Sequence, residues 1–408
     1  RIFEAMSIPT GEDGLIQYFY DEEDSQYHKI GQVEGENFGV DPTKKQIYRN
    51  IGAQEKLSEH SADIVFLWDP DGDRFNMVTT APSQKADFYR EQGLEVEVLP
   101  DKEQCIVYFT PNQIYFMLSS FRLEKLAQSG QLNEYDWFMA SSVTTSRALD
   151  ELARAHRIPL VHVKVGFKYW GNFAEWLESR SGTETLVPAG KMALDEKVEI
   201  GKKPRLIIMC EESGGAVFGG TSLVSNAADT KHLVGIREKD GFQLGFLSLS
   251  LAARLYTGKQ SFADYYCDNI ERYAIKSKFF HRHDERLYDE RLTGGAREKA
   301  VAEADAKKHR IMDFFKQLAK DFQNGASAES IQAALNSHIA TPGESRPAPS
   351  RLCLIGESVL EGTYLEFDTF WVVVRASGTD AVLRYYVEGE NRDDIRHYQG
   401  LLVGLNIS

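Results

Sequence analysis

Cysteine is scarce in this chain of 408 residues, and the four positions lie far apart: Cys105, Cys210, Cys267 and Cys353. Because their spacing matches no metal-ligand pattern, we expect free, buried thiols in a reducing compartment. Long apolar runs are missing too, since none approaches the roughly 20 residues of a membrane span. The sequence also opens without a basic-then-apolar leader of the signal-peptide type. We therefore expect a cytoplasmic location and no membrane partner.

Positive charge is in the minority, with 47 Lys and Arg against 61 Asp and Glu and a net charge of −14 at pH 7. A surface of this sign repels nucleic acid and anionic lipid, so neither is expected as a partner. An anionic substrate would need a local basic pocket, because the overall field repels it. The hydrophobic fraction of 42% and the charged fraction of 26% are typical of a globular protein.

At roughly 150 residues per domain, this length predicts two or three domains. The first residues, Arg1 to Met6, read as helix and include no initiator Met, so we expect a piece of a longer protein. Strands and helices alternate in a way that predicts α/β blocks at 1–102 and 103–272, the second starting with a strand at 106–109 and having a mostly parallel sheet. A smaller α+β block is expected at 273–408.

The first candidate site follows an apolar run, Ile64 to Trp68, that stops abruptly at turn residues. Such a run reads as a buried strand leading into a loop, and ligands collect at the carboxyl ends of strands in open α/β sheets. Asp69, Asp71 and Asp73 would repel one another on this loop without a cation, and together they suit Mg²⁺. Arg74 could face a phosphate beside the metal. The alternative is a solvated acidic turn, which fits poorly after a buried strand.

A second candidate site is the turn Arg375-Ala376-Ser377-Gly378-Thr379, which lies between two expected strands. A phosphate dianion is held best by guanidinium, hydroxyl and backbone N–H donors together, and Gly378 permits close backbone approach. Arg384 on the return strand could add a second cation. An ordinary polar hairpin turn is an equal alternative when this segment is considered alone.

The third candidate site is the loop Glu211-Glu212-Ser213-Gly214-Gly215 after another short strand. A carboxylate acceptor combined with a serine hydroxyl is suited to the vicinal hydroxyls of a sugar. A helix-capping sequence is the alternative. Lys164 and Lys168 could supply charge near a substrate, although a lone lysine after a strand is more often solvated.

Taken in chain order, the loop from Asp69 to Arg74, the loop from Glu211 to Gly215 and the turn from Arg375 to Arg384 resemble those of the α-D-phosphohexomutases, which include phosphoglucomutase and phosphomannomutase. Three further segments support the resemblance: Val165 to Trp170, the Lys239-Asp240-Gly241 sequence that opens a helix, and Arg1 to Met6. The resemblance covers nearly the whole chain. It implies consecutive α/β domains of the phosphohexomutase type, followed by a smaller α+β C-terminal domain that moves onto the substrate.

The resemblance also implies roles for individual residues. Mg²⁺ would be held by Asp69, Asp71 and Asp73, sugar hydroxyls by Glu211 and Ser213, and the non-reacting phosphate by Arg375, Ser377, Gly378 and Thr379, with Arg384 beside them. Arg74 and Lys168 would be catalytic members of the site. The implied reaction is an intramolecular phosphotransfer between the 1- and 6-positions of a hexose. It passes through a hexose 1,6-bisphosphate and uses a phosphoserine.

Departures from the family pattern modify these expectations. The serine motif of the family's first domain is not found in this chain, so we expect that domain to be missing and the fragment itself to be inactive. Gly215 stands where many members have histidine at the end of the sugar loop. Ala376 and Ala381 replace common prolines, and the segment from Arg180 to Arg205 is a longer insertion than expected.

Two other functions remain open at the level of sequence. A haloacid-dehalogenase-like phosphatase also has a strand ending in Asp-x-Asp-Gly, but Asp73 is then an extra carboxylate and the turn at Arg375 has no purpose. A phosphosugar-binding protein without catalysis is the other alternative, which the sequence upstream of Arg1 would decide. The triplet Glu211-Glu212-Ser213 favours glucose phosphates, while mannose and pentose phosphates stay open, as does the oligomeric state.

Overall fold

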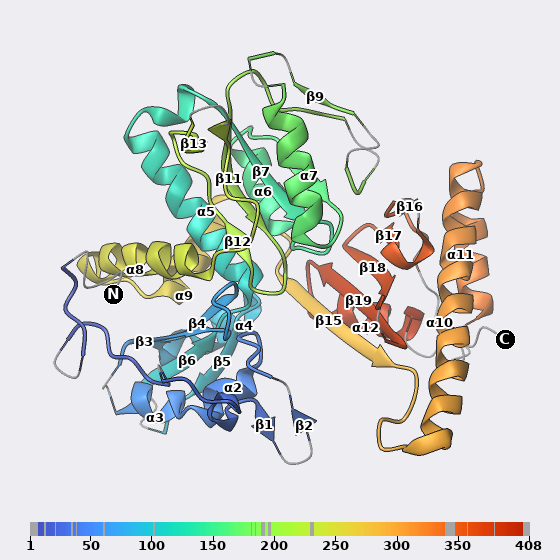
Figure 1. Cartoon of the computed structure of the whole chain (residues 1–408), viewed down its shortest axis with the longest axis horizontal. Helices are drawn as coiled ribbons and strands as arrows, with labels where there is room; N and C mark the ends of the chain where they lie inside the picture. The colour runs from blue at the N-terminus through green and yellow to red at the C-terminus, as the bar shows by residue number, and fades with distance from the viewer. Residues whose placement is uncertain are drawn as a thin grey trace.

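The structure of this protein is a computed structural model. It describes residues 7–11, 14–20, 22–33, 36–37, 39–59, 62–100, 103–180, 182–183, 185–188, 192–194, 197–228, 232–338, 347–356, 358–378 and 380–402. The helix expected at Arg1 to Met6 lies outside these residues. Figure 1 shows two lobes, a larger one built around two sheets and a C-terminal one, joined by a long strand.

The first sheet of the larger lobe has four antiparallel strands in the order β3-β4-β6-β5. They are β3 (Ile64–Trp68), β4 (Phe75–Pro82), β5 (Glu95–Val98) and β6 (Gln104–Tyr108). Helices α2 (Lys45–Asn50) and α3 (Ala53–Ser58) pack on its outer face, and α4 (Ala86–Glu91) connects β4 to β5. The sequence analysis grouped the strand at 106–109 with the second block, but β6 pairs with β4 and β5 instead.

The second sheet is mixed, with the order β12-β11-β7-β8. Its strands are β7 (Asp136–Ser142), β8 (Leu160–Val163), β11 (Pro204–Cys210) and β12 (Ala216–Val217). As predicted, β11, β7 and β8 run parallel, and only the edge strand β12 is antiparallel. Parallel strands need crossover helices, which explains why helices alternate with strands in this part of the sequence.

Five helices surround the second sheet. They are α5 (Pro111–Gln128), α6 (Ala148–Ala155), α7 (Phe167–Glu178), α8 (Gly241–Gly258) and α9 (Phe262–Arg272). A continuous apolar core joins α5, α8 and α9 to both sheets, whereas α7 covers the opposite face of the second sheet. Helix α5 begins sharply because Thr110 and Gln113 form a reciprocal capping box and Pro111 occupies the first turn.

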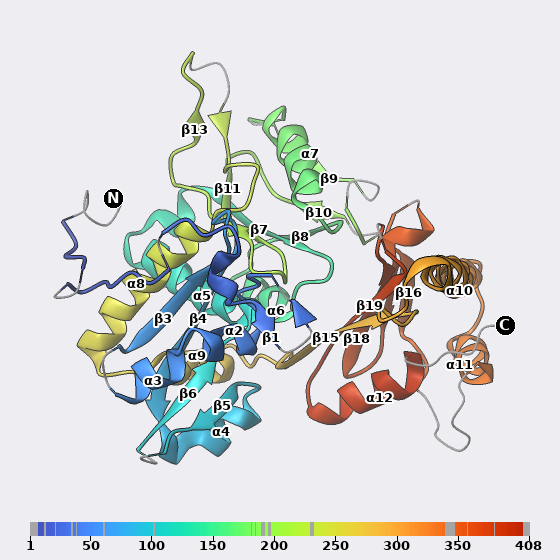
Figure 2. The ribbon, with the colours of Figure 1, turned by 60° about the horizontal axis from the view of Figure 1, so that its bottom comes forward.

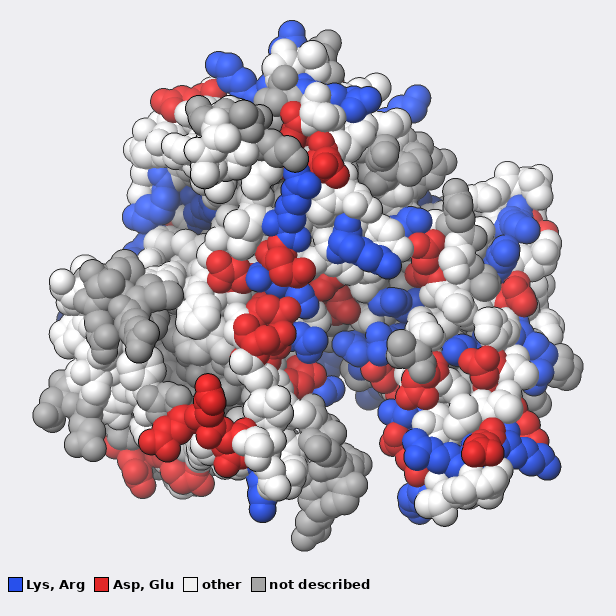
Figure 3. Space-filling model, in the orientation of Figure 1, with Lys and Arg blue, Asp and Glu red and all other residues white. Residues whose placement is uncertain are grey.

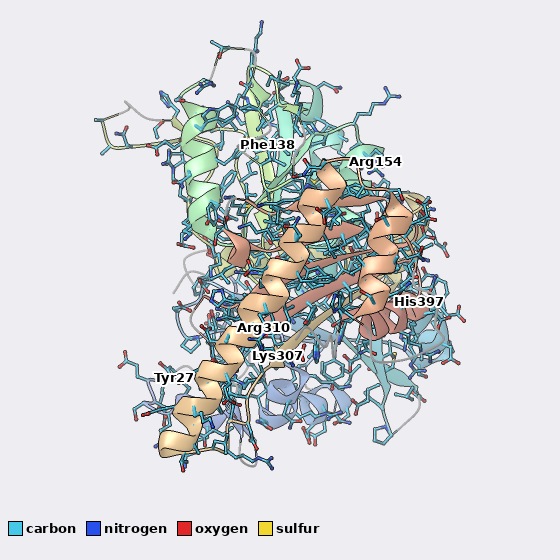
Figure 4. All side chains as sticks on the ribbon, turned by 90° about the vertical axis from the view of Figure 1, so that its right-hand side faces the viewer. Tyr27, Phe138, Arg154, Lys307, Arg310 and His397 are labelled. Carbon is cyan, nitrogen blue, oxygen red and sulfur yellow. The ribbon has the colours of Figure 1, made fainter. Side chains whose placement is uncertain are left out.

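The C-terminal lobe is an antiparallel five-stranded sheet in the order β15-β19-β18-β17-β16, with three helices on one face. Its elements are β15 (Phe279–Arg286), β16 (Arg351–Leu354), β17 (Thr363–Glu366), β18 (Phe370–Ala376), β19 (Val382–Gly389), α10 (Gly294–Gln323), α11 (Ala328–Ser337) and α12 (Arg392–Leu402). Figure 4 shows α10, which carries Lys307 and Arg310, lying beside α11 across this sheet. The lobe is the α+β unit that the sequence predicted.

The described residues also include three short hairpins: β1 (Gln32–Val33) with β2 (Glu36–Asn37), β9 (Leu186–Val187) with β10 (Val198–Glu199), and β13 (Val224–Ser225) with β14 (His232–Leu233). Four short 3-10 helices complete the described elements: Tyr27–Lys29, Ser83–Lys85, Gln131–Asn133 and Val359–Glu361. The β9–β10 hairpin is the insertion noted in the sequence. Ala193 and Leu194, between its strands, are buried against the open face of the C-terminal sheet, next to Tyr364 and Val373. The insertion therefore helps to join the two lobes.

A buried polar network also joins the lobes. Glu388 on β19 is 2% exposed and accepts hydrogen bonds from the Ser146 hydroxyl, from the Arg147 backbone N–H at 2.6 Å and from the Trp371 indole N–H at 3.1 Å. The Arg147 guanidinium lies 4.8 Å from the Trp371 ring centroid. Figure 2 shows how β15 runs from the larger lobe into this sheet.

All four cysteines are free and buried, as expected. Within the described residues, no helix combines the length and apolar character that a membrane span requires.

Candidate functional site

The three aspartates of the first candidate site converge. One carboxylate oxygen from each of Asp69, Asp71 and Asp73 lies within 4.8 Å of the others. The loop that carries them connects the antiparallel strands β3 and β4, and it turns at Gly72, whose φ is +75°. The Gly72 N–H donates to the Asp69 carbonyl at 3.0 Å, and the Arg74 N–H donates to the Asp69 carboxylate at 3.0 Å. The backbone thus fixes the direction of the first carboxylate.

The chemistry of this loop suits a hard divalent cation. The pKa of Asp69 is raised to about 6, chiefly by burial and also by the neighbouring carboxylates of Asp73 and Asp71. The hydrogen bond from the Arg74 backbone N–H acts in the opposite direction and lowers this pKa. The Oδ1 atom of Asp73 is buried and has no hydrogen-bond partner among the described residues. Clustered carboxylate oxygens, one of them buried without a hydrogen-bond partner among the described residues, are ligands that Mg²⁺ prefers, so the three aspartates fit this ion.

Two cations stand beside the aspartates. Arg74 Nε lies 3.5 Å from Asp69 Oδ2 and 3.8 Å from Asp73 Oδ1. Lys239 Nζ lies 2.8 Å from Asp73 Oδ2. Lys239 comes from the segment before α8 and was not assigned to the site by sequence reasoning. Its only signal was its place in the Lys239-Asp240-Gly241 sequence.

The aspartate loop, the 211–215 loop and the start of α8 form one backbone assembly. Arg74 and Gly215 make an antiparallel bridge, and the Phe75 N–H donates to the Gly214 carbonyl at 3.0 Å. On the other side, the Gly241 N–H donates to the Gly72 carbonyl at 3.1 Å, and the Trp68 indole N–H donates to the Gly241 carbonyl at 2.9 Å. Loops that are more than 130 residues apart in sequence are thereby held edge to edge.

This close packing makes a prediction for Gly241→Ala. The added Cβ would lie 2.6 Å from the Gly72 carbonyl oxygen and 2.9 Å from that of Arg74, so the aspartate loop must shift. Although alanine is the better helix former, we expect a net loss of about 1–3 kcal/mol in unfolding free energy, as for other overpacked sites. Urea denaturation measures this loss, and Mg²⁺ titration is expected to show weaker binding.

The matched control is Gly258→Ala at the other end of α8, where a Cβ meets nothing within 4 Å. We expect this variant to be as stable as the unaltered chain or slightly more stable. Equal stability of the two alanine variants would contradict the proposed clash.

Glu211 is a buried carboxylate of the 211–215 loop whose charge is influenced by Arg375 of the C-terminal lobe. Its Oε1 accepts a hydrogen bond from the Gly166 N–H at 2.6 Å. Burial, and then the neighbouring Glu212, raises its pKa to about 7, while Lys239, the Gly166 N–H and Arg375 oppose this rise. Glu212 is instead tied internally, accepting from the Thr144 hydroxyl at 2.7 Å.

The glycine at position 215, where many family members have histidine, has a physical reason here. A Cβ on Gly215 would overlap the aliphatic stem of Lys239, which crosses this position on its way to Asp73. Lys239 therefore occupies the space that a larger side chain at 215 would need. Ser213 is partly exposed on the same loop.

The turn at the end of β18 presents a pair of arginines. Arg375 and Arg384 are opposite each other in the β18–β19 register, and each has a buried Nε that lacks a hydrogen-bond partner within the described part of the chain. Arg384 Nε lies 3.6 Å from Asp284 Oδ2. The Ser377 N–H donates to the Val382 carbonyl at 2.9 Å. Gly378 is exposed with open space around it, whereas Thr379 lies outside the described residues.

A buried lysine supports this turn from behind. Lys308 on α10 is 4% exposed, and its ammonium donates to the carbonyls of Ser377 at 3.3 Å and Asp380 at 3.0 Å. It also pairs with Asp305 at 2.6 Å. Sequence reasoning missed Lys308 because it sits in a charged helix, where a lysine is normally read as solvated.

The two lysines near α7 have different surroundings. Lys164 Nζ lies 3.2 Å from Glu361 Oε1 and so joins the two lobes. Lys168 is exposed in the first turn of α7, with its ammonium 5.0 Å from the Tyr169 ring centroid. Figure 3 shows basic and acidic side chains gathered where the two lobes meet, above an indentation between them. The roles assigned to all these residues stay predictions.

The fold defines the chain first as an α/β protein with an α+β C-terminal lobe, and the family comparison then specifies the family. Residues 110–273 match the phosphoglucomutase/phosphomannomutase α/β/α domain III, and residues 361–403 match the C-terminal domain of the same family. The chain belongs to the α-D-phosphohexomutase family, as its loops suggested. No curated protein matches it.

Three of the solved structures that match this chain illustrate the comparison. A Burkholderia thailandensis phosphoglucomutase/phosphomannomutase family protein is 15% identical, with a TM-score of 0.46, covering 96% of this chain and 56% of that one. A Paramecium phosphoglucomutase, parafusin, is 15% identical with a TM-score of 0.43, and the match covers 83% of this chain and 43% of that one. The Aspergillus fumigatus N-acetylphosphoglucosamine mutase is 10% identical with a TM-score of 0.38, and the match covers 86% of this chain and 52% of that one. The chain thus spans about half the length of the solved structures that it matches.

Proposed function

We propose that this chain carries the metal, sugar and phosphate sites of a phosphohexomutase that interconverts hexose 1-phosphate and hexose 6-phosphate, with glucose as the favoured sugar. The observation that carries the proposal is the edge-to-edge assembly of the aspartate loop and the 211–215 loop through Arg74 and Gly215. A metal cluster and a sugar-binding carboxylate at one edge suit a phosphoryl group transferred to a sugar hydroxyl.

In this proposal Asp69, Asp71 and Asp73 hold Mg²⁺, which neutralises charge on the transferring phosphoryl group when bound. Arg74 and Lys239 add donors beside that group. Glu211 and Ser213 bind sugar hydroxyls. Glu211 is suited to this task because burial raises its pKa to about 7, so near neutral pH its carboxyl group can either accept a hydrogen bond from a sugar hydroxyl or donate one to it.

Arg375 and Arg384 hold the phosphate at the other end of the sugar, together with Ser377, Gly378 and Thr379. Two guanidinium groups side by side provide the paired donors that a phosphate dianion prefers. Fixing one phosphate far from the aspartates orients the sugar for reaction at its opposite end. Lys168 in the first turn of α7 is the remaining proposed member of the site. A hexose 1,6-bisphosphate can then bind in either of two directions.

The proposal is tested by calorimetric titration with glucose 1,6-bisphosphate, with and without Mg²⁺. Because this chain has no match for the family's serine motif, the test measures binding rather than turnover. We expect saturable binding that is tighter with Mg²⁺ and at least about tenfold weaker in Arg375→Ala, since a charge-assisted hydrogen bond is worth about 1.5–3 kcal/mol.

Arg291→Ala is the matched control, because the Arg291 side chain is 90% exposed and its one ion-pair partner in the described part of the chain is the nearby Asp289. Equal weakening in both variants would show that bulk charge, and not the turn, governs binding. Failure of the glucose, mannose and ribose bisphosphates alike to bind would overturn the proposed function. Mannose or ribose bisphosphate binding more tightly than glucose would change the sugar assignment.

A further inference from the structure

A cavity of about 390 Å³ lies between the lobes, and none of its lining residues belongs to the three loops of the candidate site. It is bordered by the start of α5, by α9, by the first residues of β15 and by α12. Its volume is within the range of about 300–1,000 Å³ that is usual for small-molecule pockets. The cavity is thus large enough for a ligand of several carbon atoms but too small for a folded partner.

The lining of the cavity is mixed, with aromatic rings beside polar side chains that include a buried asparagine. Phe116, Tyr266 and Phe279 contribute rings to the lining. Asn112 also lines it, is 4% exposed, and has an Oδ1 with no hydrogen-bond partner among the described residues. A buried amide oxygen without a donor costs about 1–3 kcal/mol, so this position favours a ligand hydroxyl or other donor.

The rim of the cavity is basic. Lys278, Arg392 and Arg396 come from two separate segments and all line the opening. Arg396 has one carboxylate, Asp393, at 3.1 Å, while Lys278 and Arg392 make no ion pair among the residues that the structure describes. The one acid in the lining, Glu388, already accepts three hydrogen bonds and is turned to the interface. Three cations with little local neutralisation favour a multiply charged anion.

One wall is fixed by backbone-to-backbone packing. Gly93 has a φ of +90°, and any Cβ there would overlap the carbonyl oxygen of Lys278. The start of β15 is therefore held directly against the turn between α4 and β5, which fixes the backbone of this wall.

We propose that this pocket is a second, separate binding site for a small phosphate monoester that carries hydroxyl groups. The phosphate is held by Lys278, Arg392 and Arg396, the carbon body packs on Phe279, and a hydroxyl donates to Asn112. Because the walls come from both lobes, an occupant contacts both and stabilises their docked arrangement, which raises the melting temperature with ligand concentration.

The experiment titrates the full chain with glycerol 3-phosphate, followed by calorimetry and by thermal unfolding. We expect saturable binding, and we expect the double variant Lys278→Gln/Arg392→Gln to weaken it at least tenfold. Both side chains lie at the rim, so this variant should fold, and its melting temperature without ligand checks that it does. Arg291→Gln/Lys299→Gln, which removes two cations whose side chains are 90% and 79% exposed and which do not line the cavity, is the charge-matched control and should bind as the unaltered chain does.

Arg375→Gln separates this pocket from the phosphate turn of the proposed active site. Binding that survives Arg375→Gln but not the double variant supports the second site, whatever the outcome with glucose 1,6-bisphosphate. Binding lost only in Arg375→Gln, or no saturation in any variant, overturns it. Inorganic phosphate tests the hydroxyl contact: it should bind more weakly than glycerol 3-phosphate, and Asn112→Leu should abolish that difference. Equal binding of the two probes to the unaltered chain would refute the role of Asn112.

Discussion

Replacing Glu388 with alanine is expected to lower the free energy of unfolding by about 3–5 kcal/mol, as for other buried charged groups that lose a partner. The carboxylate is 2% exposed and accepts from Ser146, Arg147 and Trp371. Alanine leaves these three buried donors without an acceptor, at about 1–3 kcal/mol for each donor that finds no other partner. Urea denaturation followed by tryptophan fluorescence measures the loss.

Glu390→Ala is the matched control two residues further along. Its side chain is 36% exposed and forms one surface ion pair with Lys276 at 3.1 Å, so we expect a loss of no more than about 1 kcal/mol. Because the Glu388 network joins the lobes, its loss should also lower the cooperativity of unfolding, seen as a reduced denaturant slope. A Glu388→Ala variant as stable as Glu390→Ala would mean that the three donors readily find other partners.

Local signals in the sequence were sufficient for several elements. Helix α5 spans Pro111–Gln128, and its start is set by a local capping box between Thr110 and Gln113. The two strands around Arg375 were expected as a pair, and β18 and β19 are antiparallel neighbours. In both cases the interactions that define the element lie within a few residues of it, so the local sequence is enough to predict the element.

Pairings between distant segments were not predictable in this way. Strand β6 resembles any short buried strand, and only the packing of α5 beneath the first sheet decides that it pairs with β4 and β5. Strand β15 alternates charged and partly buried residues, so its sequence contains no apolar run that would predict a strand. It exists because β19 supplies its hydrogen-bond partners along eight register positions.

The residues of the candidate site differ in the same way, because some could be predicted from the local sequence and others only from the fold. The aspartates stand close together in the sequence, so their convergence at one loop could be predicted. Lys239 and Lys308 reach their partners from other elements: Lys239 pairs with Asp73, and Lys308 supports the turn at Ser377. A lysine has the same local pattern whether it is solvated or buried against distant carbonyls, so its role appears only once the fold has brought those groups together.

The second large effect concerns pH. Burial raises the pKa of Glu388 from its usual 4.5 to about 7, although the Ser146 hydroxyl, the Arg147 backbone N–H, the Trp371 indole and the Arg147 guanidinium all favour the charged form. Between these two values the folded chain binds a proton that the unfolded chain has released. Lowering the pH through this interval therefore stabilises the fold, and the contribution of Glu388 is on the order of 3 kcal/mol.

Unfolding free energies measured between about pH 7.5 and pH 5 should consequently rise as the pH falls. Glu211 and Asp69 have raised pKa values of about 7 and about 6 and act in the same direction, so the contribution of Glu388 is read as a difference. Glu388→Gln removes its titration while keeping the size of the side chain, and we expect a flatter pH profile in this variant. Groups with lowered carboxyl pKa values, such as Asp150 and Asp264, lose their contributions only at more acidic pH. Burial lowers the pKa values of His156 and His281, which opposes the rise within this interval and is a further reason to compare the two proteins by difference. Parallel profiles for the two proteins would mean that the three hydrogen bonds outweigh burial and that Glu388 stays ionised in the folded chain.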